Sequence, residues 1–555
     1  MTDERATNPV DAALALVLAV TVVRAVYVLF LSPYALVEDE AHYWEWALRL
    51  DWSYYSKGPG VAWSIWLATS LLGNAEGVIR LPAVIASGVL ALTIARMTAR
   101  IYHDQPWKHH AAFVAAALVF LTPAYQLPAI LMTIDGPYIA CWALASYFAL
   151  LSFIPLPRGE RVAERSEVGR GEDEQSPSRR NAPALLAFAL FLGLGFLYKY
   201  TILLILPGLV AFLILNRKRI TFPPIPATAA ATLLALASLA PVIIWNAQND
   251  WVTVKHLAGH LGLAWGDQPL NPADTGGWSY DPNWTLELVG TQLGIAGLTI
   301  LLSVLGIRHA RKNKLESTRT SESLMLWLAL PILAFYLLVT LFTDAETNWP
   351  IAGYLTLIPF AARIISESSH VADGGGGPSK AGRRGSSLLY KITIVFGVLA
   401  GVVLARLDLA AAGARAVGIE GDHAGRLLSG PGMGEDFAIL SSELQSATGQ
   451  EPFIVAAHYA RASILAYYLP DRPTIVYSAS PYAGGRKSQQ DFWPDTSLAK
   501  PELIGRPAIM LGGLPEHWQP AFERIEEIDN VPSDHKGDRR TLFIGYGYRG
   551  FPEAN

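Results

Sequence analysis

Three consecutive carboxylates, Glu38, Asp39 and Glu40, follow the first long apolar block of the chain and precede a run of aromatic residues. Carboxylates close to a membrane face are costly to hold unless water or a function satisfies them. Composition alone leaves two interpretations open, a solvated acidic turn and a set of groups that exchange protons with a substrate. The segment is therefore the first candidate for a reactive site.

Cationic and polar side chains stand at the ends of other apolar blocks. Lys57 follows several aromatics and precedes a Gly-Pro pair, and Lys199 closes a later apolar block. A lysine ammonium serves as a point charge for a phosphate, although a lysine at a helix end also snorkels to water. Asp135 could simply cap a helix, and Asn348 stands beside Trp349, which could be an interfacial anchor. Each side chain thus has a functional and a structural interpretation.

Two histidines also have both a functional and a structural interpretation. His256 and His260 are four residues apart, which places both on one face if the segment is helical. That spacing can hold a metal ion, but no HExxH-like set of ligands accompanies it in the sequence. We therefore expect His260 to face the surface or an acceptor rather than a metal.

The composition indicates what must position these residues. The chain has 555 residues, of which 52% are hydrophobic and 16% charged. The apolar residues form blocks of about twenty, long enough to cross a hydrocarbon core of about 30 Å as helices. The formal net charge of -4 and the short basic clusters exclude a nucleic-acid surface. Cys141, the single cysteine, lies in an apolar block and is expected only to pack there.

Hydropathy over windows of about nineteen residues predicts roughly eleven transmembrane spans. They begin near residues 12, 82, 111, 133, 183, 201, 225, 286, 324, 350 and 388. The first block, 12–31, is too long for a signal-peptide core and is expected to be a retained anchor. Arg24 lies inside it and should face the helix bundle, because an unpaired cation in lipid is costly.

Lysine and arginine gather in alternate loops between these blocks, as they do in cytoplasmic loops. The clusters run from Arg96 to Lys108, Arg158 to Arg180, Arg217 to Arg219, Arg308 to Lys314 and Lys380 to Arg384. With the N-terminus inside, every cluster falls on the cytoplasmic side, and the other loops fall outside. We therefore expect a multi-pass protein of the cytoplasmic (inner) membrane.

The same pattern divides residues 1–407, the expected transmembrane domain, into spans and loops. The outer loops 32–80 and 245–283 are long for a helix bundle, and long loops with structure of their own are commonly functional. The segments 157–181 and 363–387 have few apolar residues or many turn formers, as cytoplasmic linkers do.

Residues 408–555 have ordinary hydropathy and should fold outside the membrane. Short apolar runs at 453–456 and 474–477 alternate with a helical stretch at 460–468, which predicts a small soluble α/β domain. No internal repeat is visible, so an inverted-repeat transporter gains no support.

This topology brings the separate candidates to one side of the membrane. The residues that it places at outer ends of spans or in outer loops are Asp39, Lys57, Asp135, Lys199, His260 and Asn348. A scattering over both faces would have excluded a single site. Their convergence favours chemistry at the outer interface over conduction, which places ionisable groups near the midplane.

Short motifs in this part of the chain resemble a known family. They are Asp39-Glu40-Ala41-His42-Tyr43, Tyr54-Tyr55-Ser56-Lys57-Gly58-Pro59, Met132-Thr133-Ile134-Asp135-Gly136-Pro137, Gly195-Phe196-Leu197-Tyr198-Lys199-Tyr200-Thr201 and Asn348-Trp349-Pro350. In this order they resemble bacterial members of the protein O-mannosyltransferase and lipid A aminoarabinose transferase family. Those are GT-C-type membrane glycosyltransferases that use lipid-phosphate sugars. The runs 458–463 and 488–493 resemble the soluble tail of these proteins more loosely.

The resemblance implies the fold and the roles of the candidates. The expected fold is a polytopic α-helical membrane protein, a GT-C-like bundle of about eleven spans with a C-terminal soluble α/β domain. Asp39 is implied as the catalytic carboxylate, a general base that gives inversion at the anomeric carbon, with Glu40 orienting it or binding the sugar and Asp135 as a further catalytic candidate. Lys57 and Lys199 are implied as ligands of the donor phosphate. The other implied substrate-binding residues are His42, Tyr43, Tyr55, His260 and Asn348.

The metal requirement is a departure from this pattern. In the aminoarabinose transferases an acid precedes the loop lysine and is a candidate ligand for a divalent ion, whereas this chain has Ser56 there. The sequence therefore gives a divalent metal little support, leaves its ligands unknown and requires no other cofactor.

The expected function is sugar transfer from a polyprenyl-phosphate carrier to an extracytoplasmic lipid, glycan or protein. A hydroxyl acceptor needs a base such as Asp39, whereas a lipid phosphate is already anionic and would only be positioned by it. The alternatives are a ligase for diphosphate-linked glycans and a flippase or transporter of lipid or sugar. The sequence does not choose the sugar or the acceptor.

Overall fold

Of the 555 residues, the computed structural model describes 9–155, 181–260, 280–372, 380–416, 425–528 and 541–552. The chain forms two compact units. The first, here called the helical unit, comprises Met1–Val26, Leu81–Ile244 and Ser279–Val402. The second, here called the mixed unit, comprises Tyr27–Arg80, Trp245–Trp278 and Val403–Asn555. Each is described by itself.

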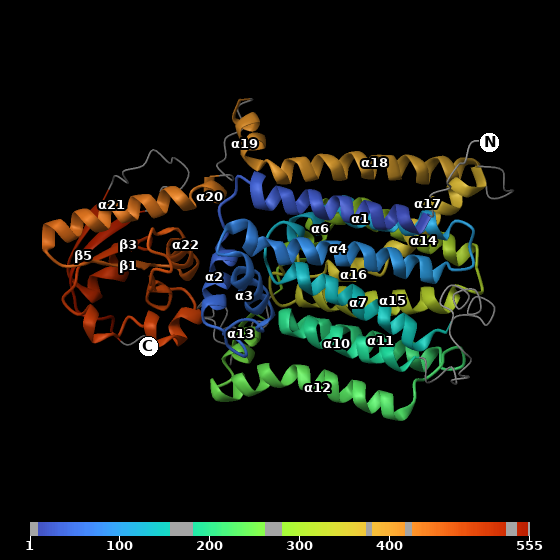
Figure 1. The fold of residues 1–555 in the computed structure, drawn as a ribbon, viewed down its shortest axis with the longest axis horizontal. Coiled ribbons are helices and arrows are strands. Elements are labelled where there is room, and N and C mark those ends of the chain that lie inside the picture. Colours follow the sequence, from blue (N-terminus) through green and yellow to red (C-terminus); the bar gives the residue numbers. More distant parts are fainter. Residues whose placement is uncertain are drawn as a thin grey trace. The chain divides into compact units, whose positions relative to one another are not determined.

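Long apolar helices make up the helical unit (Figure 1). Wholly or in larger part it contains α1 (Pro9–Val26), α4 (Glu76–Ile101), α5 (Lys108–Leu121), α6 (Pro123–Gln126), α7 (Asp135–Phe153), α10 (Ala182–Tyr198), α11 (Ile205–Leu215), α12 (Ile225–Gln248), α14 (Pro282–Lys312), α15 (Arg319–Val339), α16 (Ala352–Leu355), α17 (Ile358–Ala372) and α18 (Lys380–Ala405). Exposed leucine, valine and isoleucine side chains cover much of their outer surface, as lipid-facing helices require.

Within the described residues, seven helices are long and apolar enough to cross a membrane, or eight if the bent pair 108–121 and 123–129 counts as one span. The expected polytopic helical fold is confirmed, but the expected count of roughly eleven exceeds this number. The difference lies in the spans expected near 183, 201 and 350. The first two are shorter helices, Ala182–Tyr198 and Tyr200–Leu215, and the third is divided between α16 and α17.

Close helix contacts and buried polar pairs hold this unit together. A Cβ on Gly306 of α14 would lie 2.1 Å from the Phe360 carbonyl oxygen of α17, so only glycine permits this approach. Arg24 of α1 donates to Ser87 Oγ at 2.5 Å, and its guanidinium lies 5.0 Å from the centre of the Phe120 ring. The arginine in the first span thus faces the helix bundle and has protein partners.

The two expected linkers are only partly visible. Apart from Asn181, the linker 157–181 lies outside the described residues. In the linker 363–387 the described ends are helical, because α17 continues to Ala372 and α18 begins at Lys380.

The mixed unit contains the expected strand at 453–456, within a five-stranded sheet, and the expected helix at 460–468. The strand expected at 474–477 is wrong except at its last residue, because β2 covers only Tyr477–Ser478. The helices of this unit are α2 (Glu38–Leu48), α3 (Gly60–Leu72), α13 (Val252–His260), α19 (Leu407–Ala416), α20 (Gly425–Leu428), α21 (Gly430–Thr448), α22 (Tyr459–Tyr468) and α23 (Pro515–Trp518), and a π-helical turn spans Tyr27–Leu31. Its strands are β1 (Phe453–Ala456), β2 (Tyr477–Ser478), β3 (Ala508–Leu511), β4 (Phe522–Ile528) and β5 (Leu542–Tyr548).

The sheet has the order β2-β1-β3-β5-β4. β1 pairs in parallel with β2 and β3, whereas β5 is antiparallel to β3 and β4. α22 is the crossover between β1 and β2, as parallel neighbours require. α21 lies along the sheet against α22 and β3 (Figure 1).

One contact of this unit matters for the site. α2 packs against both α3 and α22, although α22 follows it by several hundred residues in the chain. The acidic cluster at the start of α2 therefore lies beside α22, the crossover helix between β1 and β2.

Candidate functional site

The acidic cluster forms the first turn of α2, where carboxylates favour the positive end of a helix. Val37 precedes the helix in an extended conformation, and its backbone N–H donates to Glu40 Oε2 at 3.1 Å. Glu40 therefore acts as the returning half of a capping box and fixes the start of α2.

Glu40 is also held by a buried arginine. Arg80 donates to both carboxylate oxygens of Glu40, at 2.9 and 2.7 Å. Its remaining donors reach the carbonyl oxygens of Tyr34 and Ala35, at 2.9 and 2.7 Å. Because the arginine and the glutamate are both almost fully buried, this pair binds the segment before α2 to its first turn. This geometry fits the orienting role expected for Glu40.

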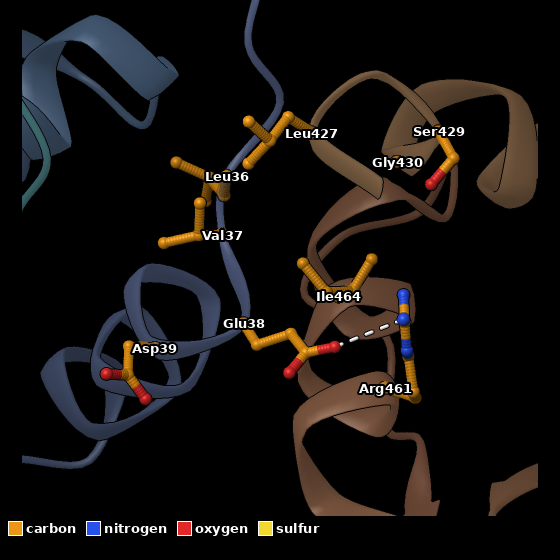
Figure 2. Close-up of a pocket in the computed structure, with 9 residues that line it drawn as sticks. All are labelled: Leu36, Val37, Glu38, Asp39, Leu427, Ser429, Gly430, Arg461 and Ile464. Carbon is orange, nitrogen blue, oxygen red and sulfur yellow. Dashed lines mark ion pairs between the residues drawn. The ribbon is translucent and has the colours of Figure 1, made fainter. Parts of the chain in front are cut away.

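Asp39 differs from Glu40 because it is exposed. It lines a pocket of about 350 Å³ whose walls come from 36–39, from Leu427, Ser429 and Gly430, and from two side chains of α22, Arg461 and Ile464. Figure 2 shows Glu38 extending from the start of α2 toward Arg461. Glu38 Oε1 and Arg461 Nη2 are 3.1 Å apart.

The negative charges of the pocket carboxylates change the pKa of a tyrosine on α22. Burial raises the pKa of Tyr459 to about 12, and the nearby negative charges of Asp39 and Glu38 add to the rise. The Tyr459 ring lies 4.8 Å from the ring of His42. The pocket is thus an acidic environment with one buried cation in its wall.

His42, which the sequence suggested as a substrate ligand, belongs to a buried network that joins α2 and α22. Its Nδ1 lies 3.0 Å from Ser463 Oγ, and its Nε2 accepts from Trp46 Nε1 at 3.2 Å. Ser463 Oγ also donates to Glu45, and Gln490 Nε2 donates to Glu45 Oε2 at 2.7 Å. The network fastens α2 to α22.

Aromatic residues of α2 pack against the turn that carries Lys57. Tyr43 is buried against Trp46, whose ring stacks on Tyr54 at 4.3 Å. Tyr54 N–H donates to the Lys57 carbonyl oxygen at 3.1 Å, which closes a tight turn. Lys57 is half-buried at the end of that turn, and Gly58 and Pro59 follow it before α3 begins. The Gly-Pro pair therefore marks a helix start, and the lysine is presented by a supported turn.

Tyr55 connects this turn to other segments of the mixed unit. Its N–H donates to Gln489 Oε1 at 2.6 Å, and its ring lies 4.9 Å from the ring of His256. His260 ends α13, and its side chain lies outside what the structure describes. Among the described residues no group of three histidine, cysteine or acidic side chains is arranged to hold a metal ion.

In the helical unit the structure brings three other predicted residues into direct contact. Asp135 begins α7 and Lys199 follows α10, and Lys199 Nζ donates to Asp135 Oδ1 at 2.8 Å. Asn348, from the loop after α15, donates to Asp135 Oδ2 at 2.6 Å. Asp135 is buried, whereas Asn348 is exposed. We call Asp135, Lys199 and Asn348 the clasp.

Local packing explains the geometry of the clasp. A Cβ on Gly136 would lie 2.5 Å from the Pro128 carbonyl oxygen, so glycine lets the start of α7 pack against the preceding turn. Lys199 Nζ lies 5.5 Å from the centre of the Tyr138 ring, a favourable cation–π arrangement. Gln292 donates to the Thr347 carbonyl oxygen at 2.8 Å and supports the loop that carries Asn348.

Sequence reasoning missed three polar residues that organise these groups. Arg80, Glu45 and Arg461 are all at most 3% exposed, and each pairs with a side chain of another segment. Arg461 gave one signal in the sequence, because it is the charged residue in an otherwise uncharged helical stretch. Arg80 stands at the end of a predicted outer loop, where a single positive charge gives no sign of a buried ion pair.

Comparison with known proteins supports the expected resemblance. The family model for dolichyl-phosphate-mannose-protein mannosyltransferases matches residues 56–154 and 177–245. The lipid A galacturonosyltransferase RgtD of Rhizobium johnstonii is 27% identical over 323 residues, which are 57% of this chain and 58% of that relative. The match therefore spans a little over half of each protein.

Solved structures show the same fold over nearly the whole chain. The crystal structure of ArnT from Cupriavidus metallidurans in the apo state has a TM-score of 0.54 and 13% identity, and it covers 96% of this chain and 97% of its own. The same protein bound to undecaprenyl phosphate has a TM-score of 0.56, 15% identity and the same coverage. The expected GT-C-like fold, with its small C-terminal sheet, is confirmed.

Proposed function

We propose that this chain, which has the fold of the GT-C-type membrane glycosyltransferases and resembles them in sequence, transfers a sugar from a polyprenyl-phosphate carrier to an extracytoplasmic acceptor. The observation that carries the proposal is the exposed carboxylate of Asp39 in a pocket of about 350 Å³ at the start of α2. A pocket of this volume suits a small ligand such as a sugar unit.

One solved structure of similar fold supports the proposed donor. One solved structure of ArnT holds undecaprenyl phosphate, a polyprenyl phosphate. Transfer from such a carrier leaves a phosphate whose charge must be stabilised. We assign this task to Lys57, which a supported turn presents, and name Lys199 as the second candidate. No metal is needed in this scheme, because the lysines supply the positive charge.

Asp39 acts as the general base in the proposed reaction. It takes the proton of an acceptor hydroxyl while that oxygen attacks the anomeric carbon, and the configuration inverts. Asp39 is exposed, so a substrate can reach its carboxylate, whereas Glu40 is buried and paired with Arg80. Glu40 therefore orients the start of α2, and the His42 network supports the same helix. If the acceptor oxygen belongs to a phosphate, Asp39 positions that group instead.

The remaining candidates have supporting roles in the proposal. Tyr43 and Tyr55 shape the aromatic wall beside Lys57, and His260 is assigned to the acceptor side. Asp135 fixes Lys199 in the clasp, and the exposed Asn348 is the member that a sugar can reach.

A lipid is the acceptor that the comparisons favour, although a glycan or a protein stays open to test. RgtD, by its name, acts on lipid A and transfers a galacturonosyl group. A hexuronate is therefore one candidate sugar for this chain. We further propose an inner-membrane location, with residues 1–407 as the transmembrane domain and 408–555 as an extracytoplasmic domain on the periplasmic side.

The test is transfer of labelled sugar from a synthetic polyprenyl-phosphate hexose or hexuronate into extracted membrane lipids and proteins. Purified wild type should label one fraction, which identifies the acceptor. Asp39→Asn should lower the rate by about 10²- to 10⁴-fold, the usual contribution of a general base. Asp471→Asn, an exposed carboxylate of the same unit outside the pocket, is the matched control and should keep its rate.

The rival functions predict other results. A ligase for diphosphate-linked glycans would be inactive with every monophosphate donor and active with a diphosphate donor. A flippase would move the lipid-linked sugar across vesicles without transferring it. Equal rates for wild type and Asp39→Asn would exclude the role given to this carboxylate.

A further inference from the structure

The helix α3 of the mixed unit presents an apolar face that the proposed site does not use. Its large side chains Trp63, Trp66, Leu67 and Leu71 are between 36% and 73% exposed. They follow one another at intervals of three, four and eight residues from Trp63, which places them on one side of the helix. We call these four residues the α3 face.

The opposite side of α3 is covered by protein. Val61, Ala62 and Ile65 are buried there, and α3 packs against α2, the helix whose first turn carries Asp39. Both sides of α3 are therefore apolar, and α2 covers only one of them. Large contiguous apolar surfaces are rarely left in water, so the α3 face should meet a second apolar phase.

The composition and length of α3 suit the interface of a bilayer. No charged residue occurs in the sequence between Lys57 and Glu76. The helix has 13 residues and is about 20 Å long, too short to cross a hydrocarbon core of about 30 Å. Tryptophan prefers the boundary between headgroups and acyl chains, because its ring is apolar and its N–H is polar. Trp63 and Trp66 fit that boundary.

The course of the chain identifies the lipid surface as the covering phase. Only residues 73–75 separate α3 from α4, whose apolar stretch 76–101 is long enough to cross a membrane. Even fully extended, the step from Leu72 to Glu76 spans at most about 14 Å. The end of α3 therefore lies close to the point where the chain enters the bilayer. A protein partner would instead favour a polar rim around the apolar centre, which this uncharged segment does not supply.

We propose that α3 lies in the interface of the extracytoplasmic leaflet, with the α3 face among the acyl chains, and that this contact sets the depth of Lys57. The contact with lipid does not depend on the proposed function. The consequence for Lys57 rests on it, because Lys57 is there the ligand of the donor phosphate.

Hydrogen bonds connect the α3 face to the turn that carries Lys57. Trp63 Nε1 donates to the Asp51 carbonyl oxygen at 3.1 Å, and the Tyr54 N–H donates to the Lys57 carbonyl oxygen at the same distance. Two residues separate Lys57 from the start of α3. The turn and the helix are thus joined at both ends. An interfacial α3 holds Lys57 at the level of lipid phosphates, where the phosphate of a membrane-bound carrier lies.

The first experiment measures what surrounds α3 in the full-length protein, in nanodiscs of phosphatidylethanolamine and phosphatidylglycerol and without substrate. Cys141, the single cysteine, is buried, and Cys141→Ala gives a background without cysteine. Leu67→Cys and Leu71→Cys then each carry one nitroxide label. Paramagnetic resonance reports collisions of the label with oxygen, which concentrates among acyl chains, and with a water-soluble nickel chelate. Both labels should collide more with oxygen than with nickel.

Two exposed leucines calibrate these collisions. Leu399→Cys, in the span 387–405, should report lipid, and Leu514→Cys, in the soluble part of the mixed unit, should report water. Labels on α3 should resemble the first. Frequent collision with nickel would overturn the proposal, because α3 would face water. Protection from both reagents would also overturn it, because a second copy, a partner protein or the segment 261–279 would then cover the helix.

Donor titration tests the depth of Lys57. Leu67→Asp/Leu71→Asp puts two charges on the α3 face, which acyl chains disfavour. The KM for a polyprenyl-phosphate donor should rise about tenfold with kcat nearly unchanged. The KM for a water-soluble donor with a short prenyl chain should stay the same, because its phosphate is not held at a fixed depth. Leu67→Met/Leu71→Met keeps the face apolar and should behave as wild type, as should Leu514→Asp.

The outcomes of the titration separate depth from damage to the site. An equal rise in KM for the long and short donors would mean that the aspartates disturb the turn itself, and would overturn the role given to α3. An unchanged KM for the long donor would overturn it as well. If wild type transferred no sugar, the proposed function and the role of Lys57 would fall together, whereas the label collisions would still decide the contact with lipid.

Discussion

The clasp of the helical unit and the pocket of the mixed unit handle charge in opposite ways. In the clasp both oxygens of Asp135 are engaged, by Lys199 and by Asn348. In the pocket Asp39 is exposed, and the Glu38–Arg461 pair has one half in water. The clasp is therefore a buried and internally paired cluster, whereas carboxylates of the pocket are accessible to solvent.

This difference teaches where chemistry and where positioning are expected. A satisfied buried pair gains little from a substrate, because its charges already have partners at good geometry. An exposed carboxylate keeps its capacity to accept a proton. The pocket is accordingly the better candidate for the reacting group, and the clasp for holding helix ends in place.

The largest effect should come from breaking the clasp. Lys199→Met removes the cation and leaves the buried Asp135 carboxylate without its charge partner, which should cost about 3–5 kcal/mol of stability. The double variant Lys199→Met/Asp135→Asn removes both charges and should regain most of this loss. The measurement is the unfolding midpoint in detergent, followed by tryptophan fluorescence.

Transfer assays on the same variants test the comparison itself. If the double variant regains stability but not sugar transfer, Lys199 acts on the donor and the clasp belongs to the site. Lys255→Met is the control, since its pair with Asp250 is largely exposed and should be worth at most about 1 kcal/mol.

The next effect concerns the network that supports the open pocket. Glu45→Gln weakens the hydrogen bonds from Ser463 and Gln490 to a buried carboxylate and should cost about 1.5–3 kcal/mol. Thermal unfolding should show the loss, whereas the rate at saturating substrate should change little below the melting range. Glu443→Gln, on the exposed side of α21, should have no such effect.

A preserved unfolding midpoint in Glu45→Gln would show that the His42 network does not fasten α2. A collapse of the transfer rate without loss of stability would instead make Glu45 part of the reaction. Either result would weaken the division between a supporting network and an open pocket.

The long apolar helices were predictable from the sequence, because the hydropathy of the chain determines where they lie. The strand Phe453–Ala456 and the helix Tyr459–Tyr468 lie where alternation and helical periodicity predicted them. The antiparallel strands β4 and β5 were not predicted, because exposed glutamates in β4 and glycines in β5 weaken the apolar pattern. The span near 350 was overestimated because a hydropathy window cannot see the break between α16 and α17.

The candidate site was predictable in part for a similar reason. Charge in the loops placed Asp135, Lys199 and Asn348 on one side of the membrane, and the three side chains are in contact. The partners of His42 and Glu38 come from α22, more than 400 residues later in the case of Ser463. Such pairings depend on the packing of α2 against α22, which no local pattern encodes.

A smaller effect is expected at the other cation of the mixed unit. Lys57→Met removes the proposed phosphate ligand and should raise the KM for the polyprenyl-phosphate donor about tenfold, or about 1.4 kcal/mol, with kcat nearly unchanged. Lys57→Arg keeps the charge and should retain most of the affinity. The assay is donor titration at fixed acceptor, with the exposed Lys487→Met as control. A fall in kcat with constant KM would place the lysine in the transition state only.

The smallest effect should appear only at alkaline pH and reports on the acidity of the pocket. The pKa of Tyr459 is raised to about 12, first by burial and then by Asp39 and Glu38. Because the folded state keeps the phenol proton more tightly than the unfolded chain, this stabilisation is full below the ordinary pKa of about 10 and is lost as the pH rises toward the folded value. Tyr459→Phe cannot titrate. Relative to it, wild type should lose about 1 kcal/mol by roughly pH 11.

Unfolding midpoints of the two proteins, measured across this range, give the difference directly. Adding Asp39→Asn to both should make the difference smaller, because part of the raised pKa comes from that carboxylate, whereas Asp471→Asn should leave it unchanged. If the Asp39→Asn substitution left this difference in unfolding midpoint unchanged, water would screen the charge of Asp39 from α22. The pocket would then be more open than the contact between Glu38 and Arg461 implies, and the contrast with the clasp would be sharper still.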